Sequence, residues 1–257
     1  MNKLFGLLFF IAALSSCGSS WIPTKVDKTL GELSNQEIIN APNQFPILDK
    51  EECAYAYERV ELIRDEIINS GELDFAQDFN WEVKIIKDDS VLNAFCLPGG
   101  NFYIYTGLIK YLDSEAALAG VIGHEMAHAD KRHSTKHLVQ NMSLSLILQY
   151  FIGVDQSSLL GLGANLLSLS FNRLDESEAD MQSVSYLNKT KYDPRGAAFF
   201  FEKIEKENKS LGPIEFMSTH PDPENRVKKI YKKWKDLGAK KGKLNKEEYK
   251  KIISDLP

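Results

Sequence analysis

Two histidines four positions apart, His124 and His128, lie in the sequence Gly-His-Glu-Met-Ala-His. The residues on either side, 116–122 and 127–129, strongly favour a helix. Because side chains at positions i and i+4 share one helix face about one turn apart, both imidazoles can reach one metal ion. Glu125 lies about 100° around the helix from His124, close enough to hold a water molecule at that metal without being a ligand. The sequence therefore predicts a helix that carries part of a metal site.

The later sequence 173–180, Arg-Leu-Asp-Glu-Ser-Glu-Ala-Asp, supplies candidates for a third ligand. Two neutral nitrogens and a carboxylate that deprotonates water are what a zinc hydrolase needs, and such a site takes three protein ligands. Glu176 and Asp180 share a helix face, whereas Glu178 points away. Glu176 can therefore bind the metal while Asp180 hydrogen-bonds a ligand histidine and sets its tautomer. The alternative is an acidic, solvated helix face.

Two further histidines, His133 and His137, follow the motif. If the helix continues, they lie about 140° and 180° around its axis from His128. We therefore expect them to face elsewhere, as surface or supporting residues.

Four motifs in order resemble a known family: N-A-F-C-L-P-G-G-N-F-Y-I-Y-T-G, G-H-E-M-A-H, R-x-x-E-x-E-A-D and T-H-P-D-P-E-N-R. They resemble the zinc metallopeptidases (gluzincins) that include the CAAX prenyl protease and HtpX, and most of all the lipid-anchored periplasmic members BepA and LoiP. The resemblance covers residues 48–233 and implies a zincin-type domain with one zinc ion per chain. It implies that His124, His128 and Glu176 are the metal ligands and that Glu125 is the general base. It also implies that Asp180 is the partner of a ligand histidine.

The resemblance also assigns residues of the substrate cleft. Asn93, Ala94 and Phe95 fall where such peptidases have an edge strand, which can bind an extended substrate through its backbone. The alternative is an interior strand. His220 and Arg226 would point into the cleft as catalytic residues, where the cation stabilises an oxyanion. In BepA-like members the matching histidine can instead occupy the open zinc position.

The remaining pattern indicates an α+β, predominantly helical fold with a small antiparallel or mixed sheet packed on the motif helix. Three short segments have the composition of strands, at 81–87, 91–97 and 101–106. Helical patterns cover 49–70, 113–190, 223–237 and 246–256, and a further helix is expected to start at Asp193-Pro194. The apolar segment 144–171 is interrupted by glycines and polar residues, so we expect two helices over the core, or alternatively a mobile lid.

The N-terminus has the features of a targeting signal. Residues 1–16 combine Lys3 with a short apolar run, typical of a signal peptide. Leu-Ser-Ser-Cys at 14–17 resembles a lipobox, which implies lipidation of Cys17; an ordinary cleavable signal is the alternative. Gly18 favours outer-membrane sorting. Residues 17–47, with three prolines from Ser19 to Pro46, then form a lipid-anchored tether.

We therefore expect a peptidase domain at 48–257 with Lys-rich C-terminal helices. The lysines of 228–251 form either a solvated face or a membrane- or partner-facing patch. The net charge of −5 argues against nucleic acid as a partner. Cys53 and Cys96 form either a disulfide or two free thiols. The sequence leaves the oligomeric state open.

Together these features predict a zinc-dependent endopeptidase of the bacterial cell envelope. It would be lipid-anchored, face the periplasm and hydrolyse unfolded or misassembled envelope proteins. One alternative is a zinc-containing lipoprotein chaperone or assembly factor with latent or no proteolytic activity. Another is a different zinc hydrolase, such as a deformylase or amidase.

Overall fold

The computed structural model describes residues 22–141, 169–207, 215–221 and 225–257. The expected signal peptide at 1–16, Cys17 and most of the apolar segment 144–171 lie outside the described residues. The helices and strands confirm an α+β, predominantly helical fold with a small sheet.

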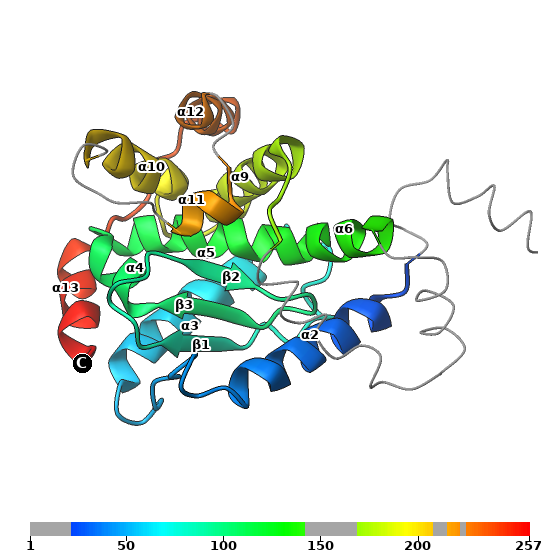
Figure 1. Ribbon diagram of the computed structural model, residues 1–257. Coiled ribbons are helices and arrows are strands. Elements are labelled where there is room, and N and C mark those ends of the chain that lie inside the picture. Colours follow the sequence, from blue (N-terminus) through cyan, green and yellow to red (C-terminus); the bar gives the residue numbers. More distant parts are fainter. Residues whose placement is uncertain (1–21, 142–168, 208–214, 222–224) are drawn as a thin grey trace, which may run out of the picture.

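Helix α5 (Glu115–Asp130), which carries the histidine motif, lies in the middle of the fold (Figure 1). On one side it packs against α9 (Arg173–Asn188) and α10 (Gly196–Glu207), with α12 (Arg226–Asp236) lying over these two helices. On its other side are the sheet and α3 (Ala54–Ile68). All sixteen residues of α5 are buried, because neighbours cover it on both sides. The other helices within the described residues are α2 (Thr24–Ile39), α4 (Thr106–Tyr111), α6 (His133–Asn141), α11 (Glu215–Thr219) and α13 (Lys246–Asp255).

The sheet has three strands in the order β1-β3-β2 and is mixed. β1 (Val83–Ile86) runs parallel to β3 (Phe102–Tyr105), and β2 (Ala94–Cys96) runs antiparallel to it. The turn between β2 and β3 contains Gly99 and Gly100, both with positive φ. Because β3 is central, β2 lies at an edge of the sheet, as the sequence predicts.

Both ends of α5 have a local cause in the sequence. At the start, the Ser114 hydroxyl oxygen accepts a hydrogen bond from the backbone N–H of Ala117, which satisfies a free donor of the first turn. At the end, Arg132 has a φ of 60°, in the left-handed region, so the chain turns and α6 begins at His133. The helical pattern expected across 113–190 is therefore interrupted at this point.

A close approach of two backbones fixes α5 against α10. A Cβ atom on Gly120 would lie 2.0 Å from the Ala197 nitrogen, and one on Gly196 would lie 1.9 Å from the Ala116 oxygen. Neither position has room for a side chain, so the two glycines allow the helices to touch.

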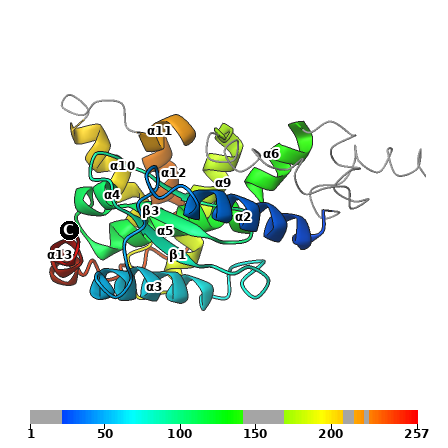
Figure 2. The same ribbon diagram turned by 60° about the horizontal axis from the view of Figure 1, so that its bottom comes forward.

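The tether prediction for residues 17–47 is wrong for 24–39, which form α2. Alternate residues of the sheet face opposite layers. One face packs against α3 and α5, while Tyr103 and Tyr105 on the other face cluster with Ile38 of α2. Figure 2 shows α2 lying along the sheet. A buried ion pair adds to this packing, since Arg132 Nη2 lies 2.6 Å from Asp27 Oδ2. This helix was missed because its partners lie about a hundred residues away.

The C-terminal helices have one buried and one exposed side. α12 buries Arg226, Ile230 and Trp234, which follow one another at intervals of four residues. Its lysines at 228, 229, 232 and 235 are exposed, which agrees with a solvated face.

Cys53 and Cys96 are buried and free, so no disulfide joins them. Among the described helices, none combines the length and the apolar character that a membrane span requires.

Candidate zinc site and substrate cleft

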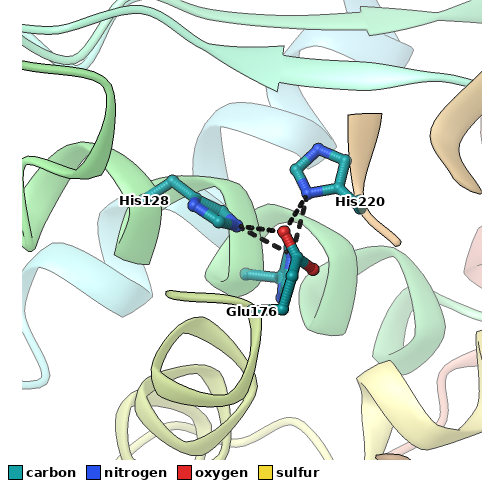
Figure 3. A group of neighbouring side chains, drawn as sticks. His128, Glu176 and His220 are labelled. Carbon is teal, nitrogen blue, oxygen red and sulfur yellow. Dashed lines mark hydrogen bonds and ion pairs between the residues drawn. The ribbon is translucent and has the colours of Figure 1, made fainter. Parts of the chain in front are cut away.

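Four buried side chains from three parts of the fold converge on one point. His124 and His128 come from α5, Glu176 from α9, and His220 follows directly after α11. Their potential ligand atoms all lie within 4.8 Å of one another. Figure 3 shows His128, Glu176 and His220 directed toward a common centre. The structure thus brings together the three predicted ligands and adds His220 as a fourth donor.

The distances within this group fit a tetrahedral zinc ion. Such an ion, with bonds of about 2.0–2.2 Å, separates neighbouring ligand atoms by roughly 3.3–3.6 Å. The Nε2 atoms of His124 and His128 are 3.1 Å apart, and each lies 3.4 Å from an oxygen of Glu176. His220 Nδ1 lies 3.4 Å from His124 Nε2 and 2.9 Å from Glu176 Oε1. The donors therefore suit zinc in type, and the distances quoted, 2.9 to 3.4 Å, are close to those of a tetrahedral site.

The two ligand histidines have different partners at their second nitrogen. Asp180 Oδ1 lies 3.0 Å from His124 Nδ1, the contact that the helix spacing predicts. His128 Nδ1 lies 2.9 Å from Nδ1 of His133. The expectation that His133 faces elsewhere is wrong, because the turn at Arg132 breaks the helix on which it was based. His137 does not touch His128; it pairs with Asp175 at the start of α9.

Arg226 lies behind the ligand carboxylate rather than in the cleft. Its Nε donates to Asp180 Oδ2 at 2.7 Å, and Nη2 donates to Asp180 Oδ1 and Glu176 Oε2, both at 2.9 Å. Its guanidinium also stacks over Phe201, 3.9 Å from the ring centre. The predicted orientation into the cleft is therefore corrected: the guanidinium pairs with two buried carboxylates on one face of α9 and does not line the cleft.

Burial and neighbouring charges set the protonation of the site in the absence of metal. Burial lowers the pKa of His128 well below its ordinary value, so this imidazole is neutral at pH 7. Burial acts in the same direction on His124, but hydrogen bonds to Asp180 and Glu176 outweigh it and raise the pKa to about 9. Burial would raise the pKa of Glu176, yet its hydrogen bonds to the three histidines hold it well below the usual range.

Glu125 lies beside the donor group without joining it. Burial raises the pKa of this carboxyl above its ordinary value, opposed by the nearby His220 and His124. Its Oε1 lies 3.4 Å from His220 Nε2 and accepts no hydrogen bond from the residues that the structure describes. A buried carboxylate oxygen without a donor is costly unless a water or substrate occupies the position next to it.

A narrow cleft opens beside Glu125 and His220. Asn93 and Phe95 line it, whereas Ala94 does not. On either side of β2, the Asn93 oxygen accepts from the N–H of Tyr105 and the N–H of Leu97 donates to the Asn101 oxygen. The intervening peptide groups of Ala94 and Cys96 therefore point to the open edge. The Asn93 side chain accepts from the N–H of Ala94 at 2.9 Å, so it covers the first edge donor itself.

Two residues of the site were not placed there by the sequence. One is His133. The other is Phe171, whose ring stacks on His128 with centroids 3.9 Å apart. Its backbone N–H donates to the Thr219 oxygen, next to His220. No spacing rule identifies Phe171, because it precedes α9 and reaches the site through the folded chain.

Comparison with known proteins agrees with this geometry. The model of peptidase family M48 matches residues 56–233. The mitochondrial metalloendopeptidase OMA1 of Arabidopsis thaliana is 37% identical over 153 residues, which are 58% of this chain and 30% of that protein. The beta-barrel assembly-enhancing protease of Escherichia coli K12 is 30% identical over 159 residues, which are 56% of this chain and 32% of that protein.

OMA1 of Saccharomyces cerevisiae matches over a longer stretch, 25% identical over 229 residues that cover 82% of this chain and 65% of that protein. The chain therefore spans between about a third and two thirds of the length of these relatives. The matched part contains all four converging side chains and Glu125. The chain belongs to peptidase family M48, a family of zinc metallopeptidases.

Proposed function

We propose that this chain is a zinc-dependent endopeptidase that cleaves unfolded or misassembled proteins. One observation carries the proposal: the buried carboxylate of Glu125 lies next to a group of donors spaced for zinc and borders the cleft beside β2, an edge strand of the described sheet. An acid–base group, a metal site and a peptide-binding edge are what hydrolysis of a peptide bond requires.

Each residue of the site has a role in this proposal. His124, His128 and Glu176 hold the zinc, which supplies Lewis-acid chemistry by polarising a carbonyl and acidifying water. Glu125 takes the proton from the attacking water and returns it to the leaving nitrogen. Asp180 orients His124 through the contact at Nδ1. Arg226 holds Glu176 and Asp180 in place, a supporting role rather than the oxyanion role first expected.

The free edge of β2 suggests the substrate class. An extended peptide that pairs with the outward groups of Ala94 and Cys96 is bound mainly through its backbone, which every unfolded chain offers. Asn93 would have to release the N–H of Ala94 to admit it. Selectivity for side chains is then broad, and foldedness is what distinguishes substrate from non-substrate.

The cellular setting follows from the N-terminal sequence. A signal peptide at 1–16, lipidation of Cys17 and a metallopeptidase domain at 48–257 preceded by α2 would hold the enzyme on the outer membrane, facing the periplasm. The beta-barrel assembly-enhancing protease among the relatives fits a role in envelope quality control. Membrane fractionation of the wild type and Cys17→Ala tests the anchor, since only the wild type should pellet with membranes.

A second candidate, a zinc-containing chaperone or assembly factor with latent or no proteolytic activity, rests on His220. This imidazole already fills the fourth position of the donor group, which a catalytic site keeps open. As a latent enzyme, the chain would cleave only when His220 moves away.

The test compares the full chain with Glu125→Gln on an unfolded casein substrate, with zinc content measured in parallel. We expect the variant to keep its zinc and to lose at least about 100-fold in cleavage rate. The exposed Glu247→Gln in α13 is the matched control and should cleave as the wild type does. Equal turnover by Glu125→Gln contradicts the proposed mechanism. Bound zinc without cleavage in the wild type and in His220→Ala favours the chaperone.

A further inference from the structure

The two ligand histidines of α5 are held at Nδ1 by different kinds of group. His124 contacts the carboxylate of Asp180, whereas His128 contacts a second imidazole, that of His133. A histidine that binds zinc through Nε2 carries its proton on Nδ1 and needs an acceptor there. For His128 that acceptor is Nδ1 of His133 at 2.9 Å.

The far side of His133 fixes which of its nitrogens can accept. His133 Nε2 lies 3.1 Å from Glu178 Oε2, and a carboxylate can only accept. His133 therefore carries its proton on Nε2, which leaves Nδ1 as a lone-pair acceptor toward His128. Hydrogen bonds then run in one direction, from His128 through His133 to Glu178.

The fold places His133 at this position with little freedom. The left-handed turn at Arg132 directs the first residue of α6 back toward α5, and His133 is fully buried there. One turn later in α6, His137 pairs with Asp175 of α9. The two contacts dock α6 on the same helix that carries Glu176, but only His133 also reaches a ligand histidine.

We propose that His133, oriented by Glu178, is a positioning residue for zinc binding that sets the tautomer and ring orientation of His128. This inference rests on the proposed zinc site and adds to it a residue that the four sequence motifs do not assign. Loss of such a supporting contact typically weakens metal affinity about 10- to 100-fold.

The test measures the zinc dissociation constant of the full chain by competition with a chromophoric chelator. His133→Phe removes the acceptor and keeps a ring, and we expect zinc to bind about 10- to 100-fold more weakly. His133→Asn returns an amide oxygen close to the position of Nδ1 and should restore most of that loss. Thermal unfolding of the zinc-free proteins, followed in parallel, separates lost affinity from lost folding.

Two further variants make the result specific. His137→Phe disrupts the neighbouring contact to α9 and should leave zinc affinity unchanged. Glu178→Ala, at a half-exposed position, folds more readily than a core variant and should weaken zinc binding several-fold. The proposal is overturned if His133→Phe binds zinc as the wild type does, if His137→Phe weakens binding equally, or if His133→Asn restores nothing.

Because zinc affinity is the readout, failure of the peptidase proposal can be distinguished from failure of the proposal for His133. A wild type that binds zinc but cleaves nothing contradicts the peptidase function and leaves the role of His133 standing. A wild type that binds no zinc overturns both.

Discussion

Arg226 and Asp180 form a two-point ion pair in the interior, with Nε–Oδ2 and Nη2–Oδ1 distances of 2.7 and 2.9 Å. Only 2% of either side chain is exposed. Asp180 Oδ1 also lies 3.0 Å from Nδ1 of His124, a predicted zinc ligand. The pair therefore connects the first residue of α12 to the metal site in α5.

Arg226→Leu should destabilise the protein by about 3–5 kcal/mol, because it takes the buried guanidinium away from two buried carboxylates. Urea unfolding of the zinc-free protein measures this loss. Arg226→Lys should recover little of it, since an ammonium cannot make the two parallel contacts of a guanidinium. Lys228→Gln, exposed on the same helix, is the control. Full recovery by the lysine variant would show that charge alone matters.

His220→Ala should cleave unfolded casein faster than the wild type. The rate should rise about tenfold for each 1.4 kcal/mol by which the His220 contacts stabilise the closed state of the site. The reason is that His220 Nδ1 fills the fourth donor position beside Glu176. Initial rates at equal zinc content measure the effect. A fall of about 100- to 1000-fold would instead assign His220 to stabilising the oxyanion.

Gly120→Ala should lower the free energy of unfolding by about 3 kcal/mol, the upper range for overpacking, because the new Cβ meets backbone of α10 at 2.0 Å. Gly123→Ala, one turn later, is the matched comparison. Its closest contact is the Ser183 side-chain oxygen, at 2.8 Å, and that hydroxyl can move at the expense of its hydrogen bond to the Gly120 oxygen, so we expect a smaller loss. Denaturant midpoints of both variants measure the change in the free energy of unfolding. Equal losses of stability in the two variants would argue against the backbone contact as the cause.

Zinc affinity should rise with pH up to about pH 9 and then level off. In the metal-free protein, hydrogen bonds to Asp180 and Glu176 keep the pKa of His124 at about 9, so below that pH zinc must displace a proton. Each pH unit below 9 should then weaken binding about tenfold through this group. Chelator competition from pH 6.5 to 9 measures the slope, and an affinity independent of pH would contradict the assignment of His124 as a ligand.

Much of the site could be read from spacing within single helices. His124 and His128 lie one turn apart in α5, and Glu176 and Asp180 lie one turn apart in α9. Helical periodicity puts each pair on one face whatever the rest of the chain does. The small sheet packed on the motif helix and the edge position of β2 follow from similar local patterns together with the family resemblance.

The structure corrected the predictions that depended on contacts distant in sequence. Whether His133 faces His128 depends on a single backbone angle at Arg132, which no hydrophobic pattern encodes. The segment 24–39 was expected to be a tether because its partners, among them Arg132 and Tyr103, lie far along the chain. Arg226 turned toward Asp180 and Glu176 because two buried carboxylates must be neutralised.

The sequence by itself determined the chemical groups, the two pairs of residues one turn apart and the helix that carries the motif, because helical periodicity is a local property of the chain. Only the tertiary structure decided how α5, α9 and the segment after α11 bring four donors within 4.8 Å of one another. It also decided which groups hold those donors, because burial and charge pairing depend on neighbours that folding brings together from distant parts of the chain.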